Sequence, residues 1–171
     1  MSVKSGLALR KESATATLLE MCSVRVEQTL FGIPIKHILE IVGSTRPKPV
    51  PLAPQFVGGL IHYRGDVLTT VSLRQLLGLR SHGQQDYQNP DAQDNLHDIL
   101  VLESAGGCFG LLVDSVGEVL TVSSADHEPN PSILDERRSS LFAGAYKLKE
   151  GLLVMLDPER LDPMRLGAAA A

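Results

Sequence analysis

The side chains of this sequence that could bind a metal or transfer a proton do not fall into the spacings that such chemistry needs. The five histidines are scattered, at positions 37, 62, 82, 97 and 127, and no two stand at the spacing of metal ligands. Cys22 and Cys108 lie in different halves of the chain, which does not match a zinc-binding motif. Asp114 and Glu118 would not face one another in a strand, and we interpret them as solvated or salt-bridged. We therefore predict no metal site and no bound cofactor.

Nucleotide-binding and hydrolase motifs are also missing from the sequence. There is no G-x-x-x-x-G-K-[ST], no G-x-G-x-x-G after a strand, no H-E-x-x-H and no G-x-S-x-G. Gly106-Gly107 is a candidate hairpin turn and not a phosphate-binding loop. These absences predict a protein that is not an enzyme.

Charge and hydropathy exclude further classes of protein. The net charge is −4 and the pI about 5.7, whereas nucleic-acid binding favours a clustered basic surface. No apolar run approaches the ~18 residues that span a bilayer. The N-terminus lacks the continuous apolar stretch of a signal peptide. Two isolated cysteines in such a chain predict reduced core residues in a cytoplasmic protein, the alternative being a disulfide or a redox switch.

Short strands separated by turns must position whatever surface the protein uses. Phe31, Ile33 and Ile35 show the period-two pattern of half-buried strands. Strand-like runs recur at 18–26, 31–35, 57–63, 67–71, 99–102, 108–113, 116–122, 141–148 and 152–156. Arg64-Gly65-Asp66 predicts a tight turn in which Gly65 supplies the freedom in φ. Because helical periodicity is almost absent, the pattern indicates an all-β sandwich or barrel.

A proline-bearing loop at 43–56 contains the spacing P-x-x-P. Such a segment could be a ligand for an SH3-like partner. The alternative is a stiff connection between two strands.

The two halves of the chain resemble each other. With a shift of 78 residues, Phe31-Gly32 falls on Phe109-Gly110 and Glu40 on Glu118; with a shift of 85, Gly59 falls on Gly144. Ser72 falls on Asp157, and each is a good N-cap for a short helical turn, at 73–77 and 158–161 respectively. The pattern indicates an internal duplication.

This duplication predicts the domain organisation. We expect a flexible N-terminal tail at 1–17, a first barrel at 18–79, a linker at 80–97, a second barrel at 98–161 and a C-terminal tail at 162–171. A unit of roughly 60 residues is marginally stable alone, so the two units should pack together and exchange a strand.

Four segments of the chain resemble motifs of the CheW-like domain family. They are FGIPIKHILEI at 31–41, PLAPQFVGGLIHYRG at 51–65, VSLR at 71–74 and GLLVDSVGEV at 110–119. The resemblance runs from about Leu18 to Leu161. It implies an all-β fold of two packed five-stranded SH3-like barrels with short helical turns. It also implies a non-catalytic adaptor that couples the cytoplasmic signalling tips of chemoreceptors to the regulatory domain of a CheA-type histidine kinase, in the cytoplasm at receptor arrays of the inner membrane.

The resemblance also implies where partners bind. Glu40 and Arg64 match the family's charged pair, and we expect them to form a hydrogen-bonded pair that shapes the binding groove. Ile41 and Leu60 are candidate contacts beside them, the alternative being that they belong to the core. His62 and Tyr63 complete the expected surface. The alternative for Arg64 is that it is a solvated turn residue with no role in binding.

Two departures from the family pattern bear on this expectation. His62-Tyr63 stands where the family has Asn-Leu, which alters the surface beside Arg64, and Ser72 stands where the family has an aspartate. The alternatives to an ordinary chemotaxis adaptor are a scaffold of a specialised pathway, such as pilus motility or surface sensing, and a regulatory module of a kinase or receiver system.

Overall fold

The computed structural model describes residues 15–79, 97–130 and 139–170. The predicted N-terminal tail and linker therefore lie almost entirely outside the described residues. The first half contains β1 (Leu18–Val26), β2 (Thr29–Pro34), β3 (Ile38–Thr45), β4 (Val57–Tyr63), β5 (Asp66–Ser72) and α1 (Leu73–Leu76). The second half contains β6 (His97–Ser104), β7 (Gly107–Val113), β8 (Ser115–Ser123), β9 (His127–Glu128), β10 (Phe142–Leu148), β11 (Gly151–Leu156), α3 (Pro158–Leu161) and α4 (Pro163–Ala170).

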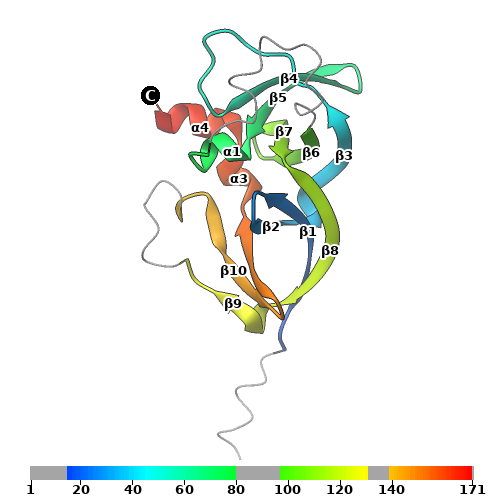
Figure 1. Cartoon of the computed structure of the whole chain (residues 1–171), viewed down its shortest axis with the longest axis vertical. Helices are drawn as coiled ribbons and strands as arrows, with labels where there is room; N and C mark the ends of the chain where they lie inside the picture. Colours follow the sequence, from blue (N-terminus) through cyan, green and yellow to red (C-terminus); the bar gives the residue numbers. More distant parts are fainter. Residues whose placement is uncertain (1–14, 80–96, 131–138, 171) are drawn as a thin grey trace, which may run out of the picture.

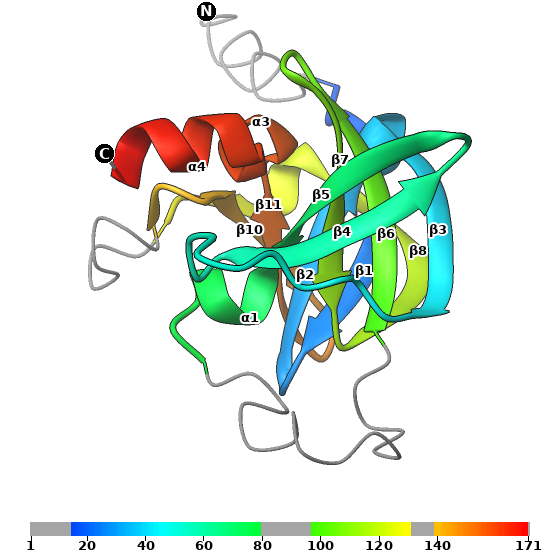
Figure 2. The ribbon, with the colours of Figure 1, turned by 90° about the horizontal axis from the view of Figure 1, so that it is seen from above.

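Two sheets form the molecule, and each takes strands from both halves of the chain (Figures 1 and 2). The six-stranded sheet has the order β8-β1-β2-β11-β10-β9, and the five-stranded sheet has the order β3-β6-β7-β5-β4. The halves thus exchange their first hairpins. The predicted barrel ranges 18–79 and 98–161 therefore do not each coincide with one sheet. The predicted all-β fold with short helices is confirmed, with one strand more than predicted in the six-stranded sheet.

The pairing of strands repeats between the sheets as the duplication predicts. The parallel pair β5–β7 corresponds to the parallel pair β11–β2. β4 and β10 each carry an irregularity near the start, with Gly59 at φ 126° and Gly144 at φ 115°, a conformation that favours glycine. The additional strand β9 pairs with Ala145, and its counterpart in the first half is a single bridge between Lys48 and Leu60. The sixth strand is therefore an extension of a contact that both halves share.

Three apolar clusters hold the sheets together. One lies among strands of the five-stranded sheet and contains Ile61, Leu68 and Val101. A second lies among strands of the six-stranded sheet and contains Met21, Tyr146 and Leu153. The third and largest draws on both sheets and on the short helices, with the buried members Cys22, Val24, Val26, Phe31, Ile33, Val71, Leu73, Leu100, Leu102, Phe109, Leu111, Val113, Leu141, Phe142, Leu156 and Leu161. Because this cluster is shared, the two sheets are parts of one folded unit.

The C-terminal residues differ from the prediction. Residues 162–171 were expected to form a tail, whereas 163–170 form α4. The buried Asp162 accepts a hydrogen bond from the backbone N–H of Met164 and another from the hydroxyl of Ser104, and Leu166 packs against the shared core. An N-cap, good helix formers and one apolar anchor are together enough to form a short helix. No helix in the described part of the chain is long and apolar enough to cross a membrane.

Candidate functional site

The turn between β4 and β5 presents Arg64 at one end of the five-stranded sheet. Tyr63 pairs with Asp66, so Arg64 and Gly65 are the two residues of the turn. Both have positive φ, 48° for Arg64 and 84° for Gly65, as in the two-residue turns that match the twist of antiparallel strands. The predicted tight turn is present, and Arg64 shares the left-handed backbone conformation that was expected of Gly65.

The predicted pair of Glu40 and Arg64 is present. Nη2 of Arg64 lies 3.4 Å from Oε2 of Glu40, and their side chains are 73% and 43% exposed. Glu40 lies on β3 and Arg64 follows β4, the strands at the two ends of the order of the five-stranded sheet. The pair therefore connects the two edges of this sheet. An exposed ion pair contributes only about 0–1 kcal/mol to stability, so its position at the surface is the more informative property.

Tyr63 lies against both members of this pair. The Cζ atom of Arg64 is 5.2 Å from the centroid of the Tyr63 ring, which is within the range of a cation–π contact. Burial and the nearby Glu40 carboxylate raise the pKa of the Tyr63 hydroxyl, and the charge of Arg64 opposes them. We refer to Glu40, Tyr63 and Arg64 as the charged cluster.

The remaining predicted site residues are placed differently. Ile41 follows Glu40 on β3 and is 48% exposed, so it does not belong to the core. Successive side chains alternate along a strand, so Leu60 and His62 lie on the opposite face of β4 from Tyr63. Leu60 is half-buried and exchanges two backbone hydrogen bonds of 2.8 Å with Lys48, and His62 is exposed. The structure thus brings three of the six predicted residues together.

Two exposed apolar residues were missed by the sequence analysis. Leu39 on β3 and Val119 on β8 are 45% and 54% exposed, and Val119 is the counterpart of Ile41 in the second half. β3 and β8 belong to different sheets but lie on the same side of the molecule in both views (Figures 1 and 2). Exposed apolar residues that gather into a patch are typical of interaction surfaces. We call Leu39, Ile41 and Val119 the β3–β8 apolar face. The sequence signal that could have revealed it is a strand with apolar residues at both odd and even positions.

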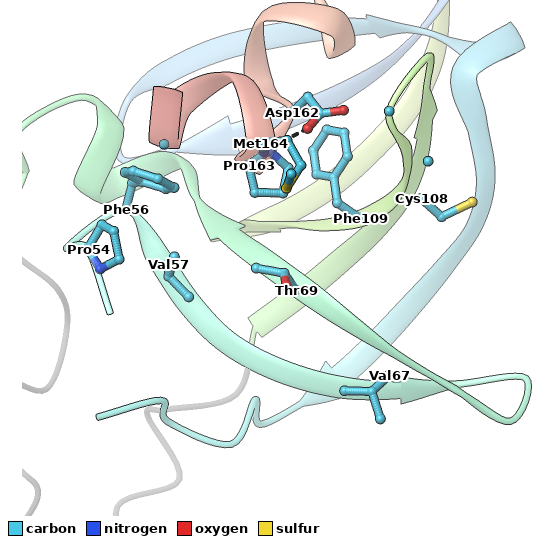
Figure 3. Close-up of a pocket in the computed structure, with 13 residues that line it drawn as sticks. Pro54, Phe56, Val57, Val67, Thr69, Cys108, Phe109, Asp162, Pro163 and Met164 are labelled. Carbon is cyan, nitrogen blue, oxygen red and sulfur yellow. Dashed lines mark hydrogen bonds between the residues drawn. The ribbon is translucent and has the colours of Figure 1, made fainter. Parts of the chain in front are cut away.

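A pocket of about 350 Å³ lies between the β4–β5 hairpin, the start of β7 and α4 (Figure 3). Apolar side chains dominate its lining, among them Phe56, Val67, Phe109 and Met164. Its charged member, Asp162, is occupied with capping α4. Cys108 also lines the pocket and is exposed, whereas Cys22 is buried. The expectation that both cysteines belong to the core was therefore wrong for Cys108, which pairs with Glu103 near the solvent-exposed end of the β6–β7 hairpin.

A second set of charges is structural. The buried Arg74 of α1 donates two hydrogen bonds to Asp114, of 2.7 and 3.0 Å, and a third of 3.2 Å to Glu27. Asp114 is therefore salt-bridged, one of the two interpretations open from the sequence. The contact joins the first half of the chain to the second, and it raises the pKa of Arg74. Among the described residues no group of histidine, cysteine and acidic side chains could hold a metal ion.

Known proteins resemble this chain in both sequence and fold. The sequence model of the CheW-like domain family matches residues 20–163. The chain is 30% identical over 151 residues to the chemotaxis protein CheW of Rhizobium meliloti, covering 88% of this chain and 92% of that protein. It is 27% identical over 158 residues to the chemotaxis protein CheW of Helicobacter pylori, covering 92% and 90%. The scaffolding protein TtCheW of Thermoanaerobacter tengcongensis has a similar fold, with a TM-score of 0.71, 22% identity and coverage of 86% of this chain and 94% of that chain.

Proposed function

Because the chain belongs to the CheW-like domain family, we propose that it is a non-catalytic adaptor that couples chemoreceptors to a CheA-type histidine kinase. The family model covers both sheets, and the curated relatives named as chemotaxis proteins match over most of their own length. The similar structure is that of a scaffolding protein. We place the protein in the cytoplasm, at the receptor arrays of the inner membrane.

The observation that carries the proposal is the charged cluster at the end of the five-stranded sheet. Arg64 and Glu40 hold opposite charges in contact at the surface. Charges held in a fixed arrangement can give a protein interface a preferred orientation and partner specificity. The regulatory domain of the kinase is the partner proposed for this end.

The β3–β8 apolar face is the surface proposed for the receptor. Its strands belong to different sheets and lie on the same side of the molecule (Figures 1 and 2). An amphipathic helix of a partner binds by laying its apolar residues against such a surface. Leu39, Ile41 and Val119 would supply the contacts.

A specialised chemosensory pathway, such as pilus motility or surface sensing, is the second candidate. The observation that favours it is His62-Tyr63 beside Arg64, because these residues alter the surface that faces the kinase. In this case the chain has the same adaptor function with a different kinase and receptor. A regulatory module of a kinase or receiver system is the remaining alternative.

Binding of purified components tests the proposal. The full chain should bind both the regulatory domain of a CheA-type kinase from the same organism and a cytoplasmic receptor fragment, measured by calorimetry. Arg64→Ala should weaken binding of the kinase domain, whereas Arg25→Ala, at an exposed arginine of β1, should not. A wild-type chain that binds neither component would contradict the adaptor function. Normal binding of the kinase domain by Arg64→Ala would show that Arg64 is not part of the interface.

A further inference from the structure

The Glu40–Arg64 pair needs support if it is to present one arrangement to a partner. Both side chains are exposed, and a single contact of 3.4 Å joins them. Exposed pairs of long side chains lose conformational entropy when they are held in one geometry, and many of them contribute nothing measurable. A bidentate contact, which adds geometric specificity, is not the geometry seen between these two residues. A third group must therefore restrict the pair.

We propose that Tyr63 is the positioning residue that holds Glu40 and Arg64 in one arrangement. The inference rests on the proposed function, in which this pair faces a partner. It also explains why the chain has an aromatic residue before Arg64, where the family pattern has leucine.

The ring of Tyr63 is itself fixed by the core. It is half-buried and packs against the apolar cluster of the five-stranded sheet that contains Ile61 and Leu68. The Cζ atom of Arg64 lies 5.2 Å from the ring centroid, close enough for the guanidinium to be attracted to the π-face. A ring that is packed against the core on one side thus limits where the arginine side chain can go.

The hydroxyl of Tyr63 extends this restraint to the other partner. The Glu40 carboxylate raises the pKa of the Tyr63 hydroxyl, so Tyr63 is coupled to the acidic residue of β3 as well as to the guanidinium of the β4–β5 turn. Leucine would fill the same apolar space, but it has neither a ring face for the cation nor a hydroxyl for the carboxylate. The substitution Tyr63→Leu therefore separates positioning from core packing, and Tyr63→Phe removes the hydroxyl alone.

Nuclear magnetic resonance of the free protein tests the positioning directly. In the wild type we expect the Nε–H group of Arg64 to be ordered on the ps–ns timescale, with less order in Tyr63→Phe and free motion in Tyr63→Leu, each variant keeping its native amide spectrum.

The pH titration of labelled tyrosine is a second readout. Glu40→Gln should lower the pKa of Tyr63, because the carboxylate raises it, and Arg64→Ala should raise the pKa further, because the guanidinium lowers it. An Arg64 that stays ordered in Tyr63→Leu, or a Tyr63 pKa that neither variant moves, would overturn the inference.

Binding of the kinase regulatory domain then shows whether positioning matters to the partner. Tyr63→Leu should weaken binding about two- to fivefold, the equivalent of an exposed cation–π contact. In the Arg64→Ala background the same substitution should have no further effect, because a positioning residue acts through the arginine. An equal loss in both backgrounds would show that Tyr63 contacts the partner on its own and would overturn the inference. If the wild type does not bind the kinase domain, the proposed function fails, and the resonance measurements still decide the role of Tyr63.

Discussion

At the scale of single residues, the two arginine pairs of this protein differ in what surrounds them. Arg74 is 6% exposed and donates to two carboxylates, whereas Arg64 is 73% exposed and contacts one. Removing one partner of a buried pair leaves an uncompensated charge, while an exposed pair is screened by water. The first pair therefore stabilises the fold, and the second is available for binding.

This difference predicts opposite outcomes for two substitutions. Arg74→Met should lower the free energy of unfolding by roughly 2–4 kcal/mol, since Asp114 and Glu27 would keep their charges without the guanidinium. Arg64→Ala should change it by no more than about 1 kcal/mol. Urea unfolding followed by circular dichroism measures both values. Equal losses in the two variants would contradict the assignment of a structural role to Arg74 alone.

At the scale of the elements, the irregular starts of β4 and β10 depend on glycine. Gly59 has φ 126°, and a Cβ atom there would lie 2.5 Å from the carbonyl oxygen of Lys48. Gly167 in α4 has no atom within 4 Å of such a Cβ. The same change from glycine to alanine thus meets a strained backbone at one position and open space in a helix at the other.

The two alanine substitutions should therefore have opposite signs. Gly59→Ala should destabilise the protein by at least about 1–2 kcal/mol, because the left-handed backbone and the carbonyl of Lys48 both resist a side chain. Gly167→Ala should stabilise it by about 0.5–1 kcal/mol through helix propensity. Thermal unfolding of both variants gives the comparison. A neutral Gly59→Ala would show that the contact between Lys48 and Leu60 can shift at no cost.

At the scale of the whole molecule, the exchange of hairpins joins the two sheets into one cooperative unit. β1 and β2 complete the six-stranded sheet, and β6 and β7 complete the five-stranded sheet. The largest apolar cluster contains residues from both. Neither sheet can lose its structure without removing strands or core contacts from the other.

We therefore expect a single unfolding transition for the full chain. Scanning calorimetry should give equal calorimetric and van't Hoff enthalpies, the test of two-state unfolding. Leu68→Ala and Leu153→Ala, which are equivalent positions in the clusters of the two sheets, should each lower the midpoint of that one transition. Two resolved transitions, each shifted by only one of the substitutions, would show that the sheets unfold independently.

The sequence by itself determined most of the strands and the duplication, which follow from period-two patterns and from the shared F-G and E positions. The pair of Glu40 and Arg64 was expected from the family resemblance, and β3 and β9 were not among the predicted strand runs. The position of α4 could not be predicted, because it depends on the contact of Asp162 with Ser104, on a distant strand. Nor could the exposed position of Cys108, which depends on where the β6–β7 hairpin ends in the folded molecule.

Only the tertiary structure decided which strands share a sheet and which apolar residues face solvent. Ile41 and Val119 have the residue types of a core, and they are exposed because β3 and β8 each stand at the edge of a sheet. Tyr63 likewise acquires its contacts from β3, 20 or so residues away in the chain, which no local pattern encodes. Sequence patterns thus predicted most of the strands, whereas the arrangement of strands that are distant in the chain produced the surface on which the proposed function depends.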